Sequence, residues 1–260
     1  MRDAPHSLFF RAYRKFCAAF LYPQFRKYLS GITSMHPLYG IPARLVGDAS
    51  ANPTEFFDHY DAFGYWVAKK ISAKGERQSI LDIGSMKLMN AMLSASHDVT
   101  ALVLADCCDR ISTVKYIRHD VSDKLPFEDN IFDVFTSSVS LPLIGLGRYG
   151  DKLNPVCLPN LIEELDRVMK PGSCLLISMC LGRNVLNFNN GWFLDMPTIE
   201  KLFPHWRVAD YLIDNQSSPR KWPSSGERFS RDISVDAGGI GNYRVIFLHL
   251  IRAVPDSLGS

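Results

Sequence analysis

Aspartates stand where several short β-rich segments of this sequence end. Asp82 and Gly84 close the first such segment, Asp106 closes the second, and Asp120 follows the third. In open α/β sheets, ligands lie beyond the carboxyl ends of the strands. Asp106, 22 residues after Gly84, would accept hydrogen bonds from both ribose hydroxyls, and Asp120 would accept from a purine amine. Each aspartate alone is equally typical of a helix cap or a turn, but together they predict a nucleoside site.

A glycine-rich run further along the chain holds Arg148, Tyr149 and Asp151, and Arg183 and Asn187 follow. The guanidinium of arginine is a planar fork of donors that suits phosphate or carboxylate. We predict that the first three are catalytic and that Arg183 and Asn187 bind an acceptor such as a sugar nucleotide, a lipid-linked phosphate or another anion. In the alternative interpretation, the glycines make a tight loop in which Arg148 and Asp151 form a structural ion pair.

The elements that would position these residues alternate between strand and helix, which is typical of an α/β domain with a parallel sheet. A glycine after the first strand permits close backbone approach, and the helix that follows offers free N–H groups. The predicted strands are 79–83, 99–105, 115–118, 132–137, 174–179, 207–213 and 243–251. The predicted helices are 7–21, 55–72, 87–95, 158–169 and 198–203.

The first predicted helix is basic and amphipathic. Its stripe Phe9, Tyr13, Phe16 and Phe20 recurs at helical spacing, and Pro23 is expected to end the helix. Residues 1–30 carry six basic residues and one acid, 6 − 1 = +5, which leaves 2 − 5 = −3 for the remainder. Such a helix either docks on the domain through its aromatic stripe, the alternative we favour, or lies on an anionic membrane surface.

Composition narrows the class of protein. The 260 residues are 47% hydrophobic with a net charge of +2, which indicates one globular domain and argues against a nucleic-acid binder. The six cysteines and the scattered histidines lack metal-ligand spacing, so we expect no metal site. The sequence shows neither eighteen consecutive apolar residues nor a signal-peptide pattern, and we expect a cytoplasmic protein with reduced thiols. We divide it into an extension (1–54), an α/β domain (55–252) and a tail (253–260).

Three segments resemble the class I S-adenosylmethionine-dependent methyltransferases: LDIGS at 81–85, LPFEDNIFD at 125–133 and ELDRVMKPG at 164–172. IGLGRYGD at 144–151 is similar to an uncharacterised methyltransferase-like family of unknown function, some members of which are encoded near bacterial surface-polysaccharide genes. Gly182-Arg183 and Asn187-Phe188-Asn189 strengthen that likeness. The resemblance covers about 66–215.

The resemblance implies a three-layer Rossmann-like methyltransferase fold, with a seven-stranded, mostly parallel sheet whose last strand is antiparallel. It implies S-adenosylmethionine bound by Asp82, Gly84 and Ser85 in the first loop, with Asp106 at the ribose and Asp120 at the adenine. The expected function is methyl transfer to a small-molecule or saccharide-linked acceptor, in surface-polysaccharide biosynthesis. Because a sulfonium methyl group is already activated, the protein has mainly to align donor and nucleophile and exclude water.

Departures from the family pattern support a second hypothesis. The first loop keeps one glycine, which Ser85 and Met86 follow, and Pro142-Leu143 stands where the narrower family has Glu-His, an obvious general base. A catalytically degenerate binding or scaffold protein on the same fold is therefore the alternative. A nicotinamide-dependent dehydrogenase ranks last, because G-x-G-x-x-G is absent from this loop. No Asn/Asp-Pro-Pro-aromatic sequence supports methylation of DNA bases or protein glutamine.

Overall fold

The computed structural model describes residues 8–45, 58–105, 111–215, 229–233 and 244–253, and side chains of the first helix only from residue 15, residue 17 excepted. Seven strands form its central sheet in the order β4-β3-β2-β5-β6-β11-β9. They are β2 (Ser79–Ile83), β3 (Asp98–Val103), β4 (Val114–Arg118), β5 (Phe132–Ser138), β6 (Met169–Leu181), β9 (Trp206–Asp214) and β11 (Arg244–Arg252).

The direction of the strands confirms the predicted sheet. Strands β2 to β6 pair in parallel, whereas β11 runs antiparallel to both β6 and β9. The inner strands are apolar on both faces because helices cover both, which is why they read as continuous apolar runs rather than alternating ones. Ile80 and Leu81 are successive residues of β2, yet each belongs to a different core cluster and neither is exposed.

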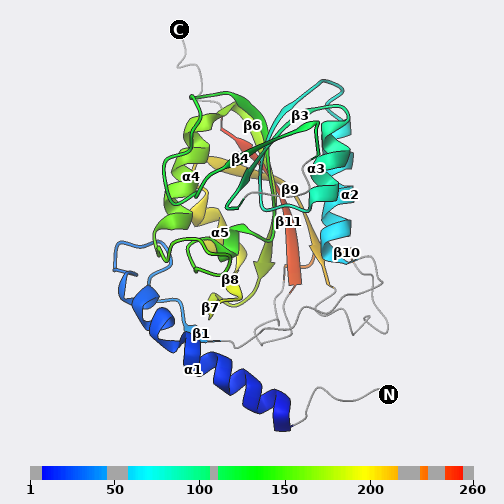
Figure 1. The fold of residues 1–260 in the computed structure, drawn as a ribbon. Coiled ribbons are helices and arrows are strands. Elements are labelled where there is room, and N and C mark those ends of the chain that lie inside the picture. The colour runs from blue at the N-terminus through cyan, green and yellow to red at the C-terminus, as the bar shows by residue number, and fades with distance from the viewer. Residues whose placement is uncertain (1–7, 46–57, 106–110, 216–228, 234–243, 254–260) are drawn as a thin grey trace.

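Helices cover both faces of the sheet, so the domain has three layers (Figure 1). On one face lie α2 (His59–Ser72) and α3 (Lys87–Ser94), whose apolar residues Phe63, Val67 and Leu93 pack in one core cluster. On the other face lie α4 (Cys157–Val168) and α5 (Met196–Leu202), packed in the second cluster. Helix α2 begins later than predicted because Asp58 caps it, accepting from the amides of Tyr60 and Asp61.

The prediction that Pro23 ends the first helix is wrong: α1 runs from Leu8 to Ser30 with Pro23 inside. A proline removes one backbone donor and strains the preceding turn, but a long helix tolerates this where packing holds its far side. That packing is present, since Phe25 and Tyr28 are buried, whereas none of the α1 side chains described before Pro23 is buried.

Four short strands were not predicted. They are β1 (Ala43–Leu45), β7 (Val185–Phe188), β8 (Gly191–Leu194) and β10 (Phe229–Ser230). β7 and β8 form a hairpin beyond the carboxyl end of β6, and β1 pairs in parallel with β7. Residues 43–45, which lie in the predicted extension (1–54), thus contribute a strand to the sheet of the α/β domain. β10 pairs with β9.

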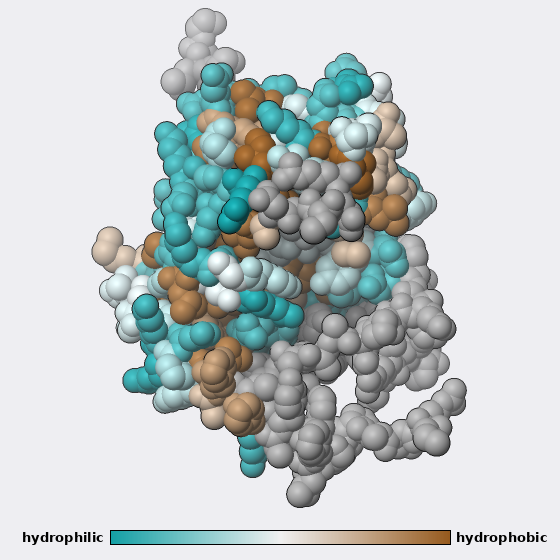
Figure 2. Space-filling view, viewed as in Figure 1, coloured by the Kyte–Doolittle hydropathy of each residue, from teal (hydrophilic) through white to brown (hydrophobic). Residues whose placement is uncertain are grey.

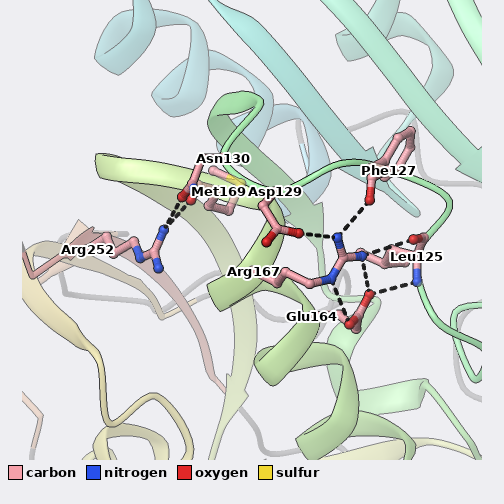
Figure 3. A network of polar contacts seen from close by, with 8 residues as sticks. All are labelled: Leu125, Phe127, Asp129, Asn130, Glu164, Arg167, Met169 and Arg252. Carbon is pink, nitrogen blue, oxygen red and sulfur yellow. Dashed lines mark hydrogen bonds and ion pairs between the residues drawn. The ribbon is translucent and has the colours of Figure 1, made fainter.

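The LPFEDN segment owes its shape to an arginine on α4 (Figure 3). The Arg167 guanidinium donates to both Glu164 carboxylate oxygens at 3.0 and 2.6 Å and to Asp129 at 2.9 Å. It also donates to the carbonyls of Leu125 at 3.0 Å and Phe127 at 2.7 Å. Glu164 in turn accepts from the Leu125 amide at 2.8 Å. These contacts make the segment a structural clasp, so the resemblance there reflects folding rather than chemistry.

Candidate functional site

A cavity of about 490 Å³ lies at the carboxyl ends of the parallel strands. Its walls are mainly apolar and come from the ends of β2, β3 and β5, from the loop before α4 and from the start of α2. They are formed by Tyr60, Ile83, Gly84, Met86, Leu102, Val103, Leu104, Ala105, His119, Val121, Ser138, Val139, Ser140, Leu143, Ile144, Tyr149 and Asp151. The volume falls in the range of about 300–1,000 Å³ typical of small-molecule sites.

The turn after β2 is closed against the turn after β5. Gly84 has φ +76°, and a Cβ there would stand 2.2 Å from Ser140 Oγ. That hydroxyl donates to the Gly84 carbonyl at 2.8 Å. Only glycine satisfies both the left-handed backbone and this close approach, so the first loop is held tightly across the sheet.

Asp82 faces inward. Its carboxylate accepts from Thr136 Oγ1 at 2.7 Å, from Asn90 Nδ2 at 2.9 Å and from the Ser85 amide at 3.2 Å. Burial raises the pKa of this carboxyl, and the hydrogen bonds oppose that rise. Neither Asp82 nor Ser85 is among the residues that line the cavity, so Asp82 positions the Gly84 turn and the start of α3.

Asp120 lies beside the cavity rather than in its wall. With Arg118, His119 and Tyr149 it lines a neighbouring hollow, and this hollow shares Leu104, Ala105, His119 and Tyr149 with the cavity. Its Oδ1 accepts from the Ser122 amide at 2.9 Å. Burial alone would raise the pKa of Asp120, but hydrogen bonds from Ser122 and Lys152 bring it below the usual value. Asp106 lies outside the described residues, and its assignment to the ribose stays a prediction.

The glycine-rich loop is organised by Asp151. One carboxylate oxygen accepts from the Gly145 amide at 2.9 Å and the Gly147 amide at 3.2 Å, and the other from the Tyr149 amide at 3.1 Å. Arg148 instead donates to the Asn189 carbonyl at 2.9 Å, and its guanidinium lies 5.4 Å from the Tyr149 ring centroid. The loop is thus a clasp made by Asp151 and backbone amides, with Tyr149 and Asp151 lining the cavity.

The two predicted acceptor residues lie elsewhere. Asn187 is a β7 residue, 2% exposed, and its Oδ1 accepts from Arg44 Nε at 2.8 Å. Arg183 is exposed at the turn between β6 and β7. Neither lines the cavity, so the structure does not bring them together with Tyr149 and Asp151.

Three cavity residues were missed from the sequence. Tyr60 lies in the first turn of α2, and burial raises the pKa of its phenol, with Tyr149 adding to the rise. His119 lines both hollows. Ser138 at the end of β5 is 3% exposed and lines the cavity, and its hydroxyl has no hydrogen-bond partner in the described structure. Only its place at a strand end could have indicated Ser138 from the sequence.

The part of the chain that the structure describes contains neither a cluster of metal ligands nor a membrane-spanning helix. No group of three or more His, Cys, Asp or Glu side chains there could hold a metal ion. None of the helices in the same part is long and apolar enough to cross a bilayer.

One family of unknown function is similar to this chain in sequence. The sequence model of the family described as "Caenorhabditis protein of unknown function, DUF268" matches residues 74–196. A search of curated proteins finds no match. The matched segment begins just before β2 and ends at the first residue of α5, so it holds most of the cavity but not Tyr60.

Solved methyltransferases share the fold at low sequence identity. The 1,6-didemethyltoxoflavin-N1-methyltransferase of Burkholderia thailandensis, solved with 1,6-didemethyltoxoflavin and S-adenosylhomocysteine, is 13% identical, with 97% of this chain and 93% of that one covered and a TM-score of 0.52. A putative sarcosine dimethylglycine methyltransferase from Galdieria sulphuraria is 12% identical, with 74% and 86% covered and a TM-score of 0.50. The chain therefore has the Rossmann-like α/β fold of the S-adenosylmethionine-dependent methyltransferases.

Proposed function

We propose that the protein is an S-adenosylmethionine-dependent methyltransferase acting on a small-molecule or saccharide-linked acceptor, such as one used in surface-polysaccharide biosynthesis. The observation that carries the proposal is the cavity itself, which lies where this fold places ligands and has mainly apolar walls that also include Ser138, His119 and Asp151. A mainly apolar cavity with a few polar groups in its wall suits a ligand that has both ring surface and hydrogen-bonding groups.

The residues present fit a nucleoside with an amino-acid tail. Leu102, Val103 and Leu104 at the end of β3 offer an apolar wall for a purine ring. Met86 precedes α3 without a side-chain cap, so the first-turn amides of α3 suit a carboxylate. We assign the ribose to Asp106, which directly follows the cavity residue Ala105. We propose that Asp82 and Ser85 act indirectly, by holding the Gly84 turn.

S-adenosylmethionine, when bound, supplies a methyl group activated by its sulfonium centre. What this chain adds is alignment and exclusion of water from an apolar site. The titratable groups among the described cavity residues are Tyr60, His119, Tyr149 and Asp151. Because Asp151 is occupied by three amides and the raised pKa of Tyr60 keeps its phenol protonated, we propose that His119 receives any proton that the acceptor loses. We propose that Arg148 steadies the Tyr149 ring.

The second candidate is a binding or scaffold protein on the same fold. Two observations favour it. The carboxylates of Asp82 and Asp151 both accept internal hydrogen bonds, and Met86, a bulky residue two positions after the glycine of the first loop, lines the cavity. A scaffold of this kind would keep the fold and the glycine-rich loop held by Asp151 but would not catalyse methyl transfer.

Isothermal titration with S-adenosylhomocysteine tests the proposal. We expect saturable binding, weakened about tenfold to a hundredfold by Asp106→Ala, because removing one partner of a buried hydrogen bond costs about 1–3 kcal/mol. The matched control is Asp98→Ala at the opposite end of β3, where the acid is exposed and paired with Arg77 at 2.6 Å. No heat at millimolar ligand would overturn the cofactor assignment. Equal loss in both variants would overturn the ribose assignment.

A further inference from the structure

The two halves of α1 have different surroundings. After Pro23, Phe25 and Tyr28 are buried, with ring centroids 5.4 and 5.6 Å from that of Phe188 in β7. Before Pro23, Phe16 is 72% exposed and Phe20 73% exposed. The expectation that the helix docks through its aromatic stripe is therefore wrong for these two residues, since docking uses the residues after Pro23.

The two most exposed aromatic residues described in α1, Phe16 and Phe20, share one face of the helix. Phe16 and Phe20 are four residues apart, which places them one above the other on a helix. Phe25 follows Phe16 by nine residues, about two and a half turns, and so lies on the opposite side of a regular helix. Figure 2 shows exposed apolar side chains among hydrophilic ones in the region where Figure 1 places α1. Phe16 and Phe20 thus point away from the domain that anchors the helix.

Charge distinguishes this stripe from other exposed apolar residues. Helix α1 carries five basic residues and no acid: Arg11, Arg14, Lys15, Arg26 and Lys27. Lys15, Arg26 and Lys27 are exposed, and Lys27 follows Phe16 by about three turns, which returns it to the same face. The sequence outside residues 1–30 has a net charge of −3, so attraction to an anionic surface is concentrated at this helix.

We propose that the N-terminal half of α1 docks on an anionic phospholipid bilayer. Phe16 and Phe20 would enter the boundary between headgroups and acyl chains, while the basic side chains lie against lipid phosphates. A helix with a bulky aromatic pair, cations beside it and no acid matches the composition of helices that lie in the plane of a membrane. The proposal is independent of the cofactor assignment.

Vesicle flotation of the full chain tests the proposal. The probe is a vesicle of phosphatidylcholine and phosphatidylserine in equal parts, compared with phosphatidylcholine alone. We expect binding to the anionic vesicles only, reduced at least tenfold by Phe16→Ser with Phe20→Ser and by Lys15→Gln with Lys27→Gln. Raised salt should weaken binding of the unaltered chain, because it screens the attraction.

The matched control is Leu88→Ser with Met92→Ser on α3, a pair of apolar residues with the same spacing that are 67% and 61% exposed. We expect the control to bind vesicles as the unaltered chain does, and circular dichroism to show all three double variants folded. Three results would each overturn the proposal: equal binding to both vesicle types, no effect of the Phe16 and Phe20 changes, or sedimentation showing that the stripe instead joins two copies of the chain.

Discussion

Asp151 determines the shape of one wall of the cavity, because its carboxylate fixes three backbone amides of a loop rich in left-handed glycines. Gly145, Gly147 and Gly150 all have positive φ, between +72° and +86°. Ordering the backbone of such a loop costs conformational entropy, and the hydrogen bonds to Asp151 offset that cost. Any ligand that contacts Tyr149 therefore depends on this carboxylate to hold the loop in place.

We expect Asp151→Ala to lower the free energy of unfolding by about 1–3 kcal/mol, because it leaves amides that were hydrogen-bonded without their acceptor. Urea denaturation measures the change. Asp123→Ala is the control, since that acid is 59% exposed and pairs with Lys152 at the surface, where ion pairs contribute little. Equal stability of the Asp151 variant and the parent would contradict the claim that Asp151 holds the glycine-rich loop.

At the scale of single residues, the sequence could not predict the direction in which each side chain points. Type and spacing placed Asp82 and Asp120 at strand ends, and the structure agrees. Whether a carboxylate faces a cavity depends on neighbours far along the chain: Asp82 meets Thr136, which is 54 residues away. Tyr60 was missed for a related reason, because its role comes from where α2 packs rather than from a local motif.

At the scale of elements, the Arg167 clasp joins α4 to the segment before β5. The guanidinium is only one-fifth exposed and makes contacts with two carboxylates and two carbonyls. Lysine carries the same charge but offers no planar fork, so it cannot reproduce these contacts together.

Arg167→Lys should therefore destabilise the protein by about 2–3 kcal/mol, within the range for breaking a partly buried charged network. Thermal denaturation followed by circular dichroism measures the loss. Glu163→Ala, an exposed neighbour on α4, should stay within about 0.5 kcal/mol of the parent. A Lys variant as stable as the parent would show that the segment is held by its apolar contacts alone.

Elements with strong local patterns were predictable. β2 matches its predicted bounds, and β3, β4, β5, β9 and β11 differ by one or two residues at an end. The β7–β8 hairpin and β1 were missed because strands of three or four residues carry almost no periodic signal. β1 forms only by pairing with a strand more than a hundred residues away.

At the scale of the whole molecule, one carboxylate connects three distant segments. Asp210 in β9 accepts from Lys70 of α2 and from Arg231, each at 2.6 Å. Burial raises the pKa of Asp210, but the hydrogen bonds and charges of Lys70 and Arg231 outweigh it and lower the pKa to about 2. The folded state therefore holds this carboxylate charged at a pH where the unfolded chain would protonate it.

A depressed pKa contributes stability that is fully present above the ordinary value of 3.8 and is lost as the pH falls toward 2. Asp210→Asn should accordingly flatten the acid side of the stability profile by about 1–2 kcal/mol between pH 4 and pH 2, since one pKa unit corresponds to about 1.4 kcal/mol. Urea denaturation across that range measures it, with the exposed Glu76→Gln as control. Parallel profiles for Asp210→Asn and the parent would contradict the assignment.

The way α1 is anchored has a consequence for how an acceptor would arrive. The helix packs on β7, beyond the carboxyl end of β6, and the turn after it contacts Pro155 through His36. In Figure 1 the parallel strands run toward the end of the molecule where α1 lies, and the cavity opens at those strand ends. A molecule resting on a bilayer through this helix would hold the mouth of its cavity near the lipid. Substrates tethered there would be found by lateral diffusion in two dimensions rather than by release into bulk water.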